Sequence, residues 1–275
     1  MSAGQGAFAR ATGVSRRSDG SFSAEIFPDW CIGSRPNGGY LLAIALQALS
    51  ATVPYEDPIV VSSHFLAAPA AGSAEVDVEV VRIGRTLARA EARLSQDGEE
   101  HVRVLAAYGS LGRPALGSQL VQERPPSIPE PEACIPVLAT TPDGRTSPVR
   151  SQFDIRYHPE SVGWASGMPT GRAEVKAWMR LADGSPPDAA LIPLLVDVLP
   201  ASVYDLGVVG WVPTVEMTIH LRSRPRPGWL LCATQCRFAS AGIMEEDASV
   251  WDADGVLIAT CRQLALLPVA SDQEG

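Results

Sequence analysis

The chain contains 275 residues, which is enough for one large domain or two medium ones with a substantial core. Hydrophobic residues make up 46% and charged residues 19%, a balance typical of a folded protein and not of a disordered one. The net charge of −9 argues against a nucleic-acid-binding surface, which would be basic. We therefore expect no nucleic-acid partner.

The sequence gives no sign of export or membrane insertion. The N-terminal segment lacks the apolar core of a signal peptide, and no run approaches the roughly 18 apolar residues of a membrane span. Five cysteines form no CxxC pair and give an odd count, which is typical of free thiols in a reducing compartment. These features predict a cytoplasmic protein without a membrane partner.

The first half of the chain predicts one buried helix followed by a run of strands. Residues 1–28 form a lead-in and a hairpin that turns at Asp19-Gly20. Residues 40–49 are apolar except for Gln47, and a helix that is apolar on every side has to be enclosed by its own domain. Strands are predicted at residues 58–66, 74–83, 86–94 and 101–109, with a turn at Asp97-Gly98.

Residues 111–150 have a different composition. Eight prolines fall in this segment, and its hydrophobic periodicity is weak, which is typical of a connector. We therefore divide the chain into an N-terminal domain at residues 1–110, a linker at residues 111–150 and a C-terminal domain at residues 151–275.

The second half begins with a strand at residues 173–181 and a second apolar helix. Ser185 is a candidate N-cap, Pro186 suits the first helical position, and Asp188 completes an acidic variant of the capping box. The apolar run LIPLLVDVL ends at Pro200, so we predict a helix over residues 185–199. Pro193 should kink this helix or delay its start.

The order of elements in the second half repeats that in the first. Strands are predicted at residues 212–221, 229–238, 242–251 and 256–267. Two turn markers recur at nearly the same offset: Pro69 and Pro225 lie 156 residues apart, and Gly98 and Gly255 lie 157 apart. The repeat predicts two tandem domains of the α+β class, each a helix wrapped by an antiparallel sheet, which is the double hotdog architecture.

Four segments carry a resemblance to a known family: RPNGGYLLAIALQAL, SSHFLAAPAAG, GRTLARAEARLSQDG and DADGVLIATCRQLALLP. Together they resemble the acyl-CoA thioesterase II (TesB-like) family over nearly the whole chain outside the linker. The resemblance implies a double hotdog thioesterase that hydrolyses acyl-CoA without a cofactor or metal. It also implies a homo-oligomer, such as a dimer, with the catalytic residues in the C-terminal domain.

In that family hydrolysis is attributed to an aspartate on the second-domain helix, a threonine on the next strand and a glutamine on the last strand. The matching positions are Thr214 in TVEM and Gln263 in IATCRQLALL. The aspartate corresponds to Asp197 in LLVDVLP, with Asp205 just beyond the helix as a second candidate.

The residues themselves support two of these assignments. Asp197 is an acid on an apolar helix, where an unpaired carboxylate is costly, so it needs either structural partners or a catalytic role. Gln263 lies on the apolar face of its strand, as a core amide with partners or as a ligand of a water molecule. Thr214 begins a strand and would not be selected without the resemblance.

Four further residues are candidates for substrate binding. Gly38 and Gly39 begin the first helix, where a missing side chain lets a ligand approach the backbone N–H groups. Arg222 and Arg224 could contact the phosphates of coenzyme A, although a solvated basic edge is the simpler interpretation.

Two other functions stay open. One is an acyl-CoA-binding or lipid-binding double hotdog without catalysis. The other is an (R)-specific enoyl-CoA hydratase, which shares the fold but would need an Asp and a His five residues apart in a loop. Asp154 and His158 are too close in sequence to form that pair.

Overall fold

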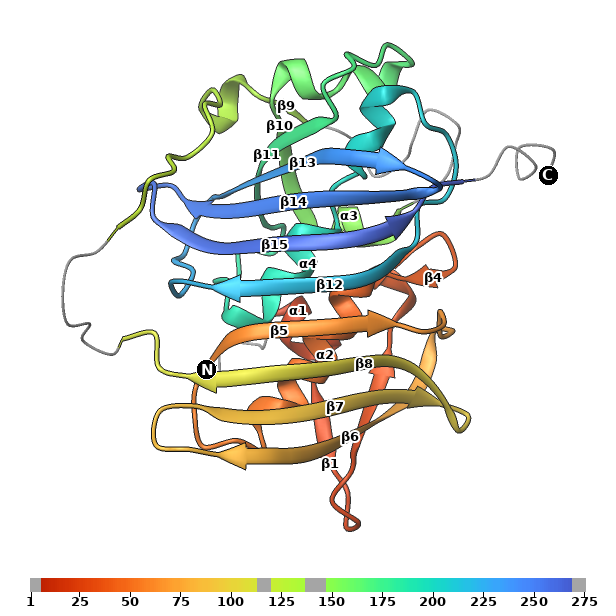
Figure 1. Cartoon of the computed structure of the whole chain (residues 1–275), viewed down its shortest axis with the longest axis vertical. Helices are drawn as coiled ribbons and strands as arrows, with labels where there is room; N and C mark the ends of the chain where they lie inside the picture. The colour runs from red at the N-terminus through yellow and green to blue at the C-terminus, as the bar shows by residue number, and fades with distance from the viewer. Residues whose placement is uncertain (1–5, 113–119, 137–146, 269–275) are drawn as a thin grey trace.

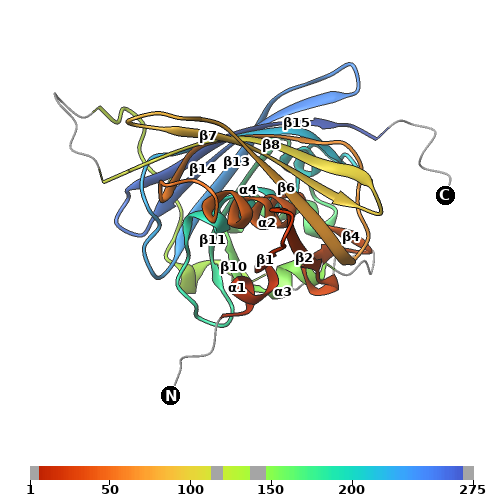
Figure 2. The same ribbon diagram turned by 90° about the horizontal axis from the view of Figure 1, so that it is seen from below.

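The computed structural model describes residues 6–112, 120–136 and 147–268. Thirteen of its strands form one antiparallel sheet in the order β1-β2-β6-β7-β8-β5-β12-β15-β14-β13-β11-β10-β9 (Figure 1). The sheet curves around α2 and α4, which lie side by side beneath it (Figure 2). The fold is therefore the double hotdog predicted from the sequence.

Besides the short 3₁₀ helix η1 (Pro28–Trp30), the N-terminal half contributes ten helices and strands. They are α1 (Ala7–Ala11), β1 (Val14–Arg16), β2 (Phe22–Ile26), β3 (Cys31–Ile32), β4 (Arg35–Pro36), α2 (Gly38–Ser50), β5 (Asp57–Phe65), β6 (Gly72–Ile83), β7 (Ala88–Gln96) and β8 (Glu99–Gly109). The predicted hairpin turn at Asp19-Gly20 joins β1 to β2, and Gly20 adopts a positive φ of 95° there.

The rest of the chain adds three short 3₁₀ helices (η), namely η2 (Pro131–Ala133), η3 (Pro159–Ser161) and η4 (Gly163–Ser166), and eleven further elements. They are β9 (Ile135–Pro136), α3 (Pro148–Ser151), β10 (Phe153–Tyr157), β11 (Glu174–Leu181), η5 (Ala189–Leu191), α4 (Ile192–Asp197), η6 (Ser202–Leu206), β12 (Thr214–Leu221), β13 (Leu230–Ser240), β14 (Ile243–Asp252) and β15 (Leu257–Leu266). The predicted linker lies partly outside the described residues, and its described part adds β9 to the edge of the sheet. The three domain limits stay predictions.

The helix α2 is a core element, with ten of its 13 residues buried. Asn37 caps it: the side-chain oxygen accepts a hydrogen bond from the Tyr40 N–H at 3.0 Å, which satisfies one of the free N–H groups at the helix start. From Leu42 to Ala45 the side chains have no solvent exposure. The sequence predicted this enclosure correctly.

The second helix begins later than predicted. Residues 185–188 are not helical, Asp188 and not Ser185 acts as the cap, and its carboxylate accepts from the Leu191 N–H at 3.0 Å. The reason is local, because Pro186 precedes Pro187, and a residue before proline is disfavoured in the helical region. Pro193 then occupies the second position of α4, where a missing N–H costs nothing, so it delays the helix and does not kink it.

The segment Ala189–Leu206 has the length and apolar composition of a membrane span, with a mean hydropathy of 1.6 over 18 residues. The expectation that no run approaches this length is therefore wrong. In the structure 67% of this window is buried, and Pro200 separates α4 from η6. The helix packs on α2, so its composition is that of a core element.

The two halves join edge to edge through β5 and β12. Ser62 of β5 faces Thr218 of β12 across the junction, and these residues lie 156 positions apart, the same offset as Pro69 and Pro225. In an antiparallel pair, a residue that faces its own repeat partner marks a pseudo-two-fold axis. The register of the sheet therefore confirms the duplication and supplies a residue-by-residue map between the halves.

Candidate active site

Asp197 ends α4 and points at the start of α2. One carboxylate oxygen, Oδ2, accepts a hydrogen bond from the Gly39 N–H at 2.9 Å, and the Asn37 side-chain amide donates to the Asp197 backbone oxygen at 3.3 Å. The carboxylate thus lies at the positive end of the α2 dipole. Both helices, one from each half of the chain, are needed to hold this acid.

The two helices approach closely because Gly39 has no side chain. A Cβ atom at this position would lie 2.3 Å from the Pro193 backbone oxygen and 2.6 Å from the Leu194 Cα. Gly38 is less crowded, since its added Cβ would meet the end of the Phe65 ring at 2.9 Å. The glycine pair was predicted to bind substrate, and in this structure the Gly39 N–H donates to the acid.

Burial raises the pKa of Asp197 to about 7. The hydrogen bond from Gly39 acts against this rise in pKa, and the negative charge of Glu246 adds to it. A carboxyl that titrates near neutral pH can accept a proton and later release it, as a general base must. Together with its position at the start of α2, this raised pKa makes Asp197 a candidate base.

Thr214 and Gln263 are brought together at the start of β12 and on β15. The Thr214 hydroxyl donates to Gln263 Oε1 at 3.0 Å, and Gln263 Nε2 donates to Glu246 Oε1 at 2.6 Å. Gln263 is only 7% exposed, on the inner face of the sheet as its strand parity predicted. The predicted threonine and glutamine therefore form a direct pair.

Glu246 on β14 is a site residue that the sequence analysis missed. It is 2% exposed, and its Oε2 accepts from the Ser202 N–H at 2.7 Å and also from the Ser202 hydroxyl. Its negative charge acts on Asp197, which links the Thr214–Gln263 pair to the acid on α4. Strand parity could have found it, because Met244 and Ala248 on the same face are buried and apolar.

The described residues contain no group of three or more His, Cys, Asp or Glu side chains placed to hold a metal ion. All five cysteines are free, as predicted.

Comparison with known proteins identifies the family. Models of the N-terminal and C-terminal acyl-CoA thioesterase domains match residues 26–112 and 131–267. The chain belongs to the acyl-CoA thioesterase family. A provisionally assigned thioesterase II of Thermobifida fusca is 30% identical and superimposes with a TM-score of 0.87, over 96% of this chain and 98% of that one.

Two further relatives show how far the likeness extends. A hot dog fold protein of unknown function from Alicyclobacillus acidocaldarius has a TM-score of 0.83 at 23% identity, covering 96% of this thioesterase-family chain and 99% of its own. An uncharacterised protein of Mycobacterium tuberculosis is 27% identical over 269 residues, covering 90% of this chain and 91% of its own. The first of these supports the fold alone.

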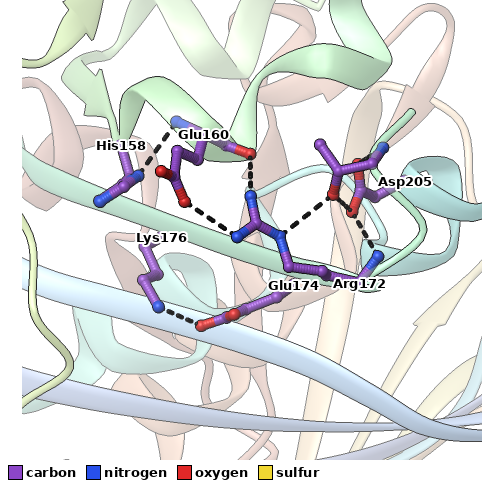
Figure 3. Close-up of polar contacts among 7 residues, drawn as sticks. His158, Glu160, Arg172, Glu174, Lys176 and Asp205 are labelled. Atoms are coloured by element: carbon purple, nitrogen blue, oxygen red, sulfur yellow. Dashed lines mark hydrogen bonds and ion pairs between the residues drawn. The ribbon is translucent and has the colours of Figure 1, made fainter. Parts of the chain in front are cut away.

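Asp205 is the second candidate for the base in this thioesterase-family chain. The hydrogen-bonding capacity of its carboxylate is taken up by residues 170–172 of a neighbouring loop. Its carboxylate, 1% exposed, accepts from the Thr170 N–H at 2.7 Å, the Thr170 hydroxyl at 2.6 Å and the Arg172 N–H at 3.1 Å (Figure 3). Arg172 in turn pairs with Glu160 at 2.9 Å. These contacts describe a loop anchor and leave Asp197, held at the start of α2, as the candidate base.

We expect Asp205→Asn to destabilise the fold more than it slows turnover. The new amide would point a donor at the Arg172 N–H, and a buried donor without an acceptor costs about 1–3 kcal/mol. Thermal melting and kcat check this, with Glu160→Gln as the control. That side chain is 64% exposed in the same network, so its loss should cost at most about 1 kcal/mol. A tenfold loss of kcat in folded Asp205→Asn would contradict the anchor role.

The predicted phosphate contacts follow the end of β12 that is opposite Thr214. Arg222 follows the end of β12 opposite Thr214, eight residues away or roughly 25 Å along the strand. Arg224 pairs with Asp57 through two hydrogen bonds of 2.6 and 3.0 Å, and it also contacts Glu56. Arg224 therefore joins the two halves of the fold, and Arg222 is the member of the pair without an acidic partner among the described residues.

Proposed function

We propose that this protein hydrolyses acyl-CoA thioesters to the free acid and coenzyme A. The observation that carries the proposal is the placement of a buried acid, Asp197, on the N–H groups at the start of α2, where the charge of Glu246 in the hydrogen-bonded Glu246–Gln263–Thr214 chain acts on it. Membership of the acyl-CoA thioesterase family supports the substrate class.

In the proposed reaction Asp197 removes a proton from a water molecule as the water oxygen attacks the thioester carbonyl. Thr214 accepts the second hydrogen of that water, because its own hydrogen is given to Gln263. The tetrahedral intermediate collapses with loss of the coenzyme A thiolate, which takes up the proton held by Asp197. The free acid and the thiol are the products.

The negative charge that forms on the carbonyl oxygen lies at the N-terminal end of α2, where the helix dipole stabilises it. Gly38 lies at this end, where the tip of the Phe65 ring and the Asp197 carboxylate would lie within 3.2 Å of an added Cβ, so the substrate carbonyl would meet the backbone beside the acid and not a side chain at residue 38. The acyl chain follows the apolar side chains between the helices and the sheet. The protein acts in the cytoplasm as a homo-oligomer, such as a dimer.

We expect the purified protein to release thiol from acyl-CoA, with kcat/KM rising through an acid limb at an apparent pKa of about 7. Below that pH Asp197 is protonated and cannot act as a base, and above it the activity should level off. A thiol-trapping assay with substrates from acetyl-CoA to palmitoyl-CoA, over about pH 5 to pH 9, checks this prediction. Absence of thiol release at every chain length, with acyl-CoA still bound, would instead support a non-catalytic binding protein.

A further inference from the structure

Glu246 is buried without a counter-charge. It is 2% exposed, its pKa is raised chiefly by that burial, and among the described residues it forms no ion pair. An acid in this position is costly to the fold, and the cost is only partly offset by its hydrogen bonds from Ser202 and Gln263. A group held at such cost calls for an explanation beyond packing.

The repeat supplies an internal comparison. In the C-terminal half Gln263 pairs across strands with Glu246 and with Met217; in the N-terminal half Ala106 pairs in the same way with Ala90 and Val61. Both alanines are at most 1% exposed. The same architecture is thus built with small apolar side chains at these positions, so the fold itself does not require Glu246 or Gln263.

Glu246 decides which way round the Gln263 amide lies. An ionised carboxylate can only accept hydrogen bonds, so it takes the NH₂ end of the amide and turns Oε1 toward Thr214. The Thr214 hydrogen is then directed at Gln263, and the free lone pairs of the hydroxyl face away from the amide. A water molecule held by Thr214 and Asp197 meets two acceptors, which leaves its own lone pair for the carbonyl carbon.

We infer that Glu246 is a positioning residue of the proposed hydrolase, which orients the Thr214 hydroxyl through the Gln263 amide and is itself fixed by Ser202. The inference rests on the proposed function and adds a residue to it. The backbone N–H of Ser202 fixes the orientation of the Glu246 side chain, because it needs a hydrogen-bond acceptor at Oε2, the oxygen that does not bind Gln263.

Charge gives a second route by which Glu246 acts. Among the described residues, Glu246 of β14 and Cys261 of β15 interact electrostatically with Asp197, and the start of α2 contributes the Gly38 and Gly39 N–H groups and the Asn37 amide. The negative charge of Glu246 raises the pKa of Asp197, so its removal should lower that pKa. The acid limb of kcat/KM should then move to lower pH.

The test is Glu246→Gln. The Ser202 N–H will hold the carbonyl end of the new amide, which presents its NH₂ to Gln263 and forces that amide to reverse. Thr214 must then accept from Gln263 and point its hydrogen at the water. We expect kcat to fall about 10- to 100-fold, KM to stay within about twofold, and the acid limb to shift to lower pH.

A double-mutant cycle with Thr214→Val separates positioning from a structural role. If Glu246 acts through Thr214, then Glu246→Gln added to Thr214→Val should change kcat by less than about twofold. Additive losses would overturn the inference. Glu246→Ala is the second variant, since the fold already holds alanine at the equivalent Ala90, and it should lose kcat to a similar extent.

The control is Glu245→Gln, on the adjacent, outward-facing position of β14 beside Arg262, which should leave kcat and the acid limb unchanged. If Glu246→Gln kept the wild-type kcat, the inference about Glu246 would be overturned. The proposed thioesterase function would stand, because the wild type would still release thiol. A wild-type protein that releases no thiol would instead defeat the proposed function before any variant is compared.

Discussion

Replacement of Asp197 by asparagine should abolish most of the hydrolysis while preserving the fold. The amide keeps the shape of the carboxylate, and its oxygen can still accept from the Gly39 N–H. It cannot take a proton from water, so we expect kcat to fall about 10²- to 10⁴-fold, the range that a general base contributes. Steady-state thiol release with acyl-CoA measures kcat and KM separately.

The same variant should be more resistant to heat than the wild type at pH 8. Because the folded-state pKa of Asp197 lies above its unfolded value, the wild type loses stability as pH rises from about 4 to about 7. Asparagine has no charge to bury and avoids this loss. Melting temperatures measured over a pH series test the direction of this change in stability. A gain in stability together with a loss of turnover is the combination that a structural acid would not give.

Asp205→Asn is the matched comparison, since it neutralises the other candidate acid. Its carboxylate is held by Thr170 and Arg172, so it should lose stability and keep most of its turnover. Wild-type kcat in Asp197→Asn, or a larger loss of kcat in Asp205→Asn, would contradict the assignment of the base.

The sequence predicted the elements whose burial pattern is simple. The helix α2 is apolar on every side, and β7 alternates apolar and polar residues, so both follow from periodicity alone. The duplication followed from the spacing of turn residues, which the sheet register confirms at Ser62 and Thr218. These signals are local or periodic, and they do not depend on which residues meet across the fold.

The site was harder to predict because it is assembled from distant segments. Glu246 lies between two other acids, Glu245 and Asp247, and a run of three acids is typical of a solvated turn. Only the alternation of buried and half-buried residues along β14 places Glu246 on the inner face. The pairing of Arg224 with Asp57 spans 167 residues, so no local pattern marks that arginine as a structural one. Asp197 was identified as an odd acid on an apolar helix, but its partner Gly39 belongs to the other half.

Gly39→Ala should be strongly destabilising although it adds a single methyl group. In an ordinary helix this substitution would favour folding by about 1 kcal/mol. Here the added Cβ would lie 2.3 Å from the Pro193 backbone oxygen, and backbone cannot rotate away as a side chain can. The helices must separate, so we expect a net loss of about 2–4 kcal/mol, or roughly 5–15 °C in Tm.

Activity should fall with stability, because the same movement draws Asp197 away from the start of α2. Gly38→Ala is the control for stability: its added Cβ meets the Phe65 ring, which can turn aside, so it should cost less than about 1 kcal/mol. Calorimetry on both variants gives the comparison. Equal melting temperatures would mean that the contact between α2 and α4 can relax, and that the acid does not depend on the close approach of the two helices.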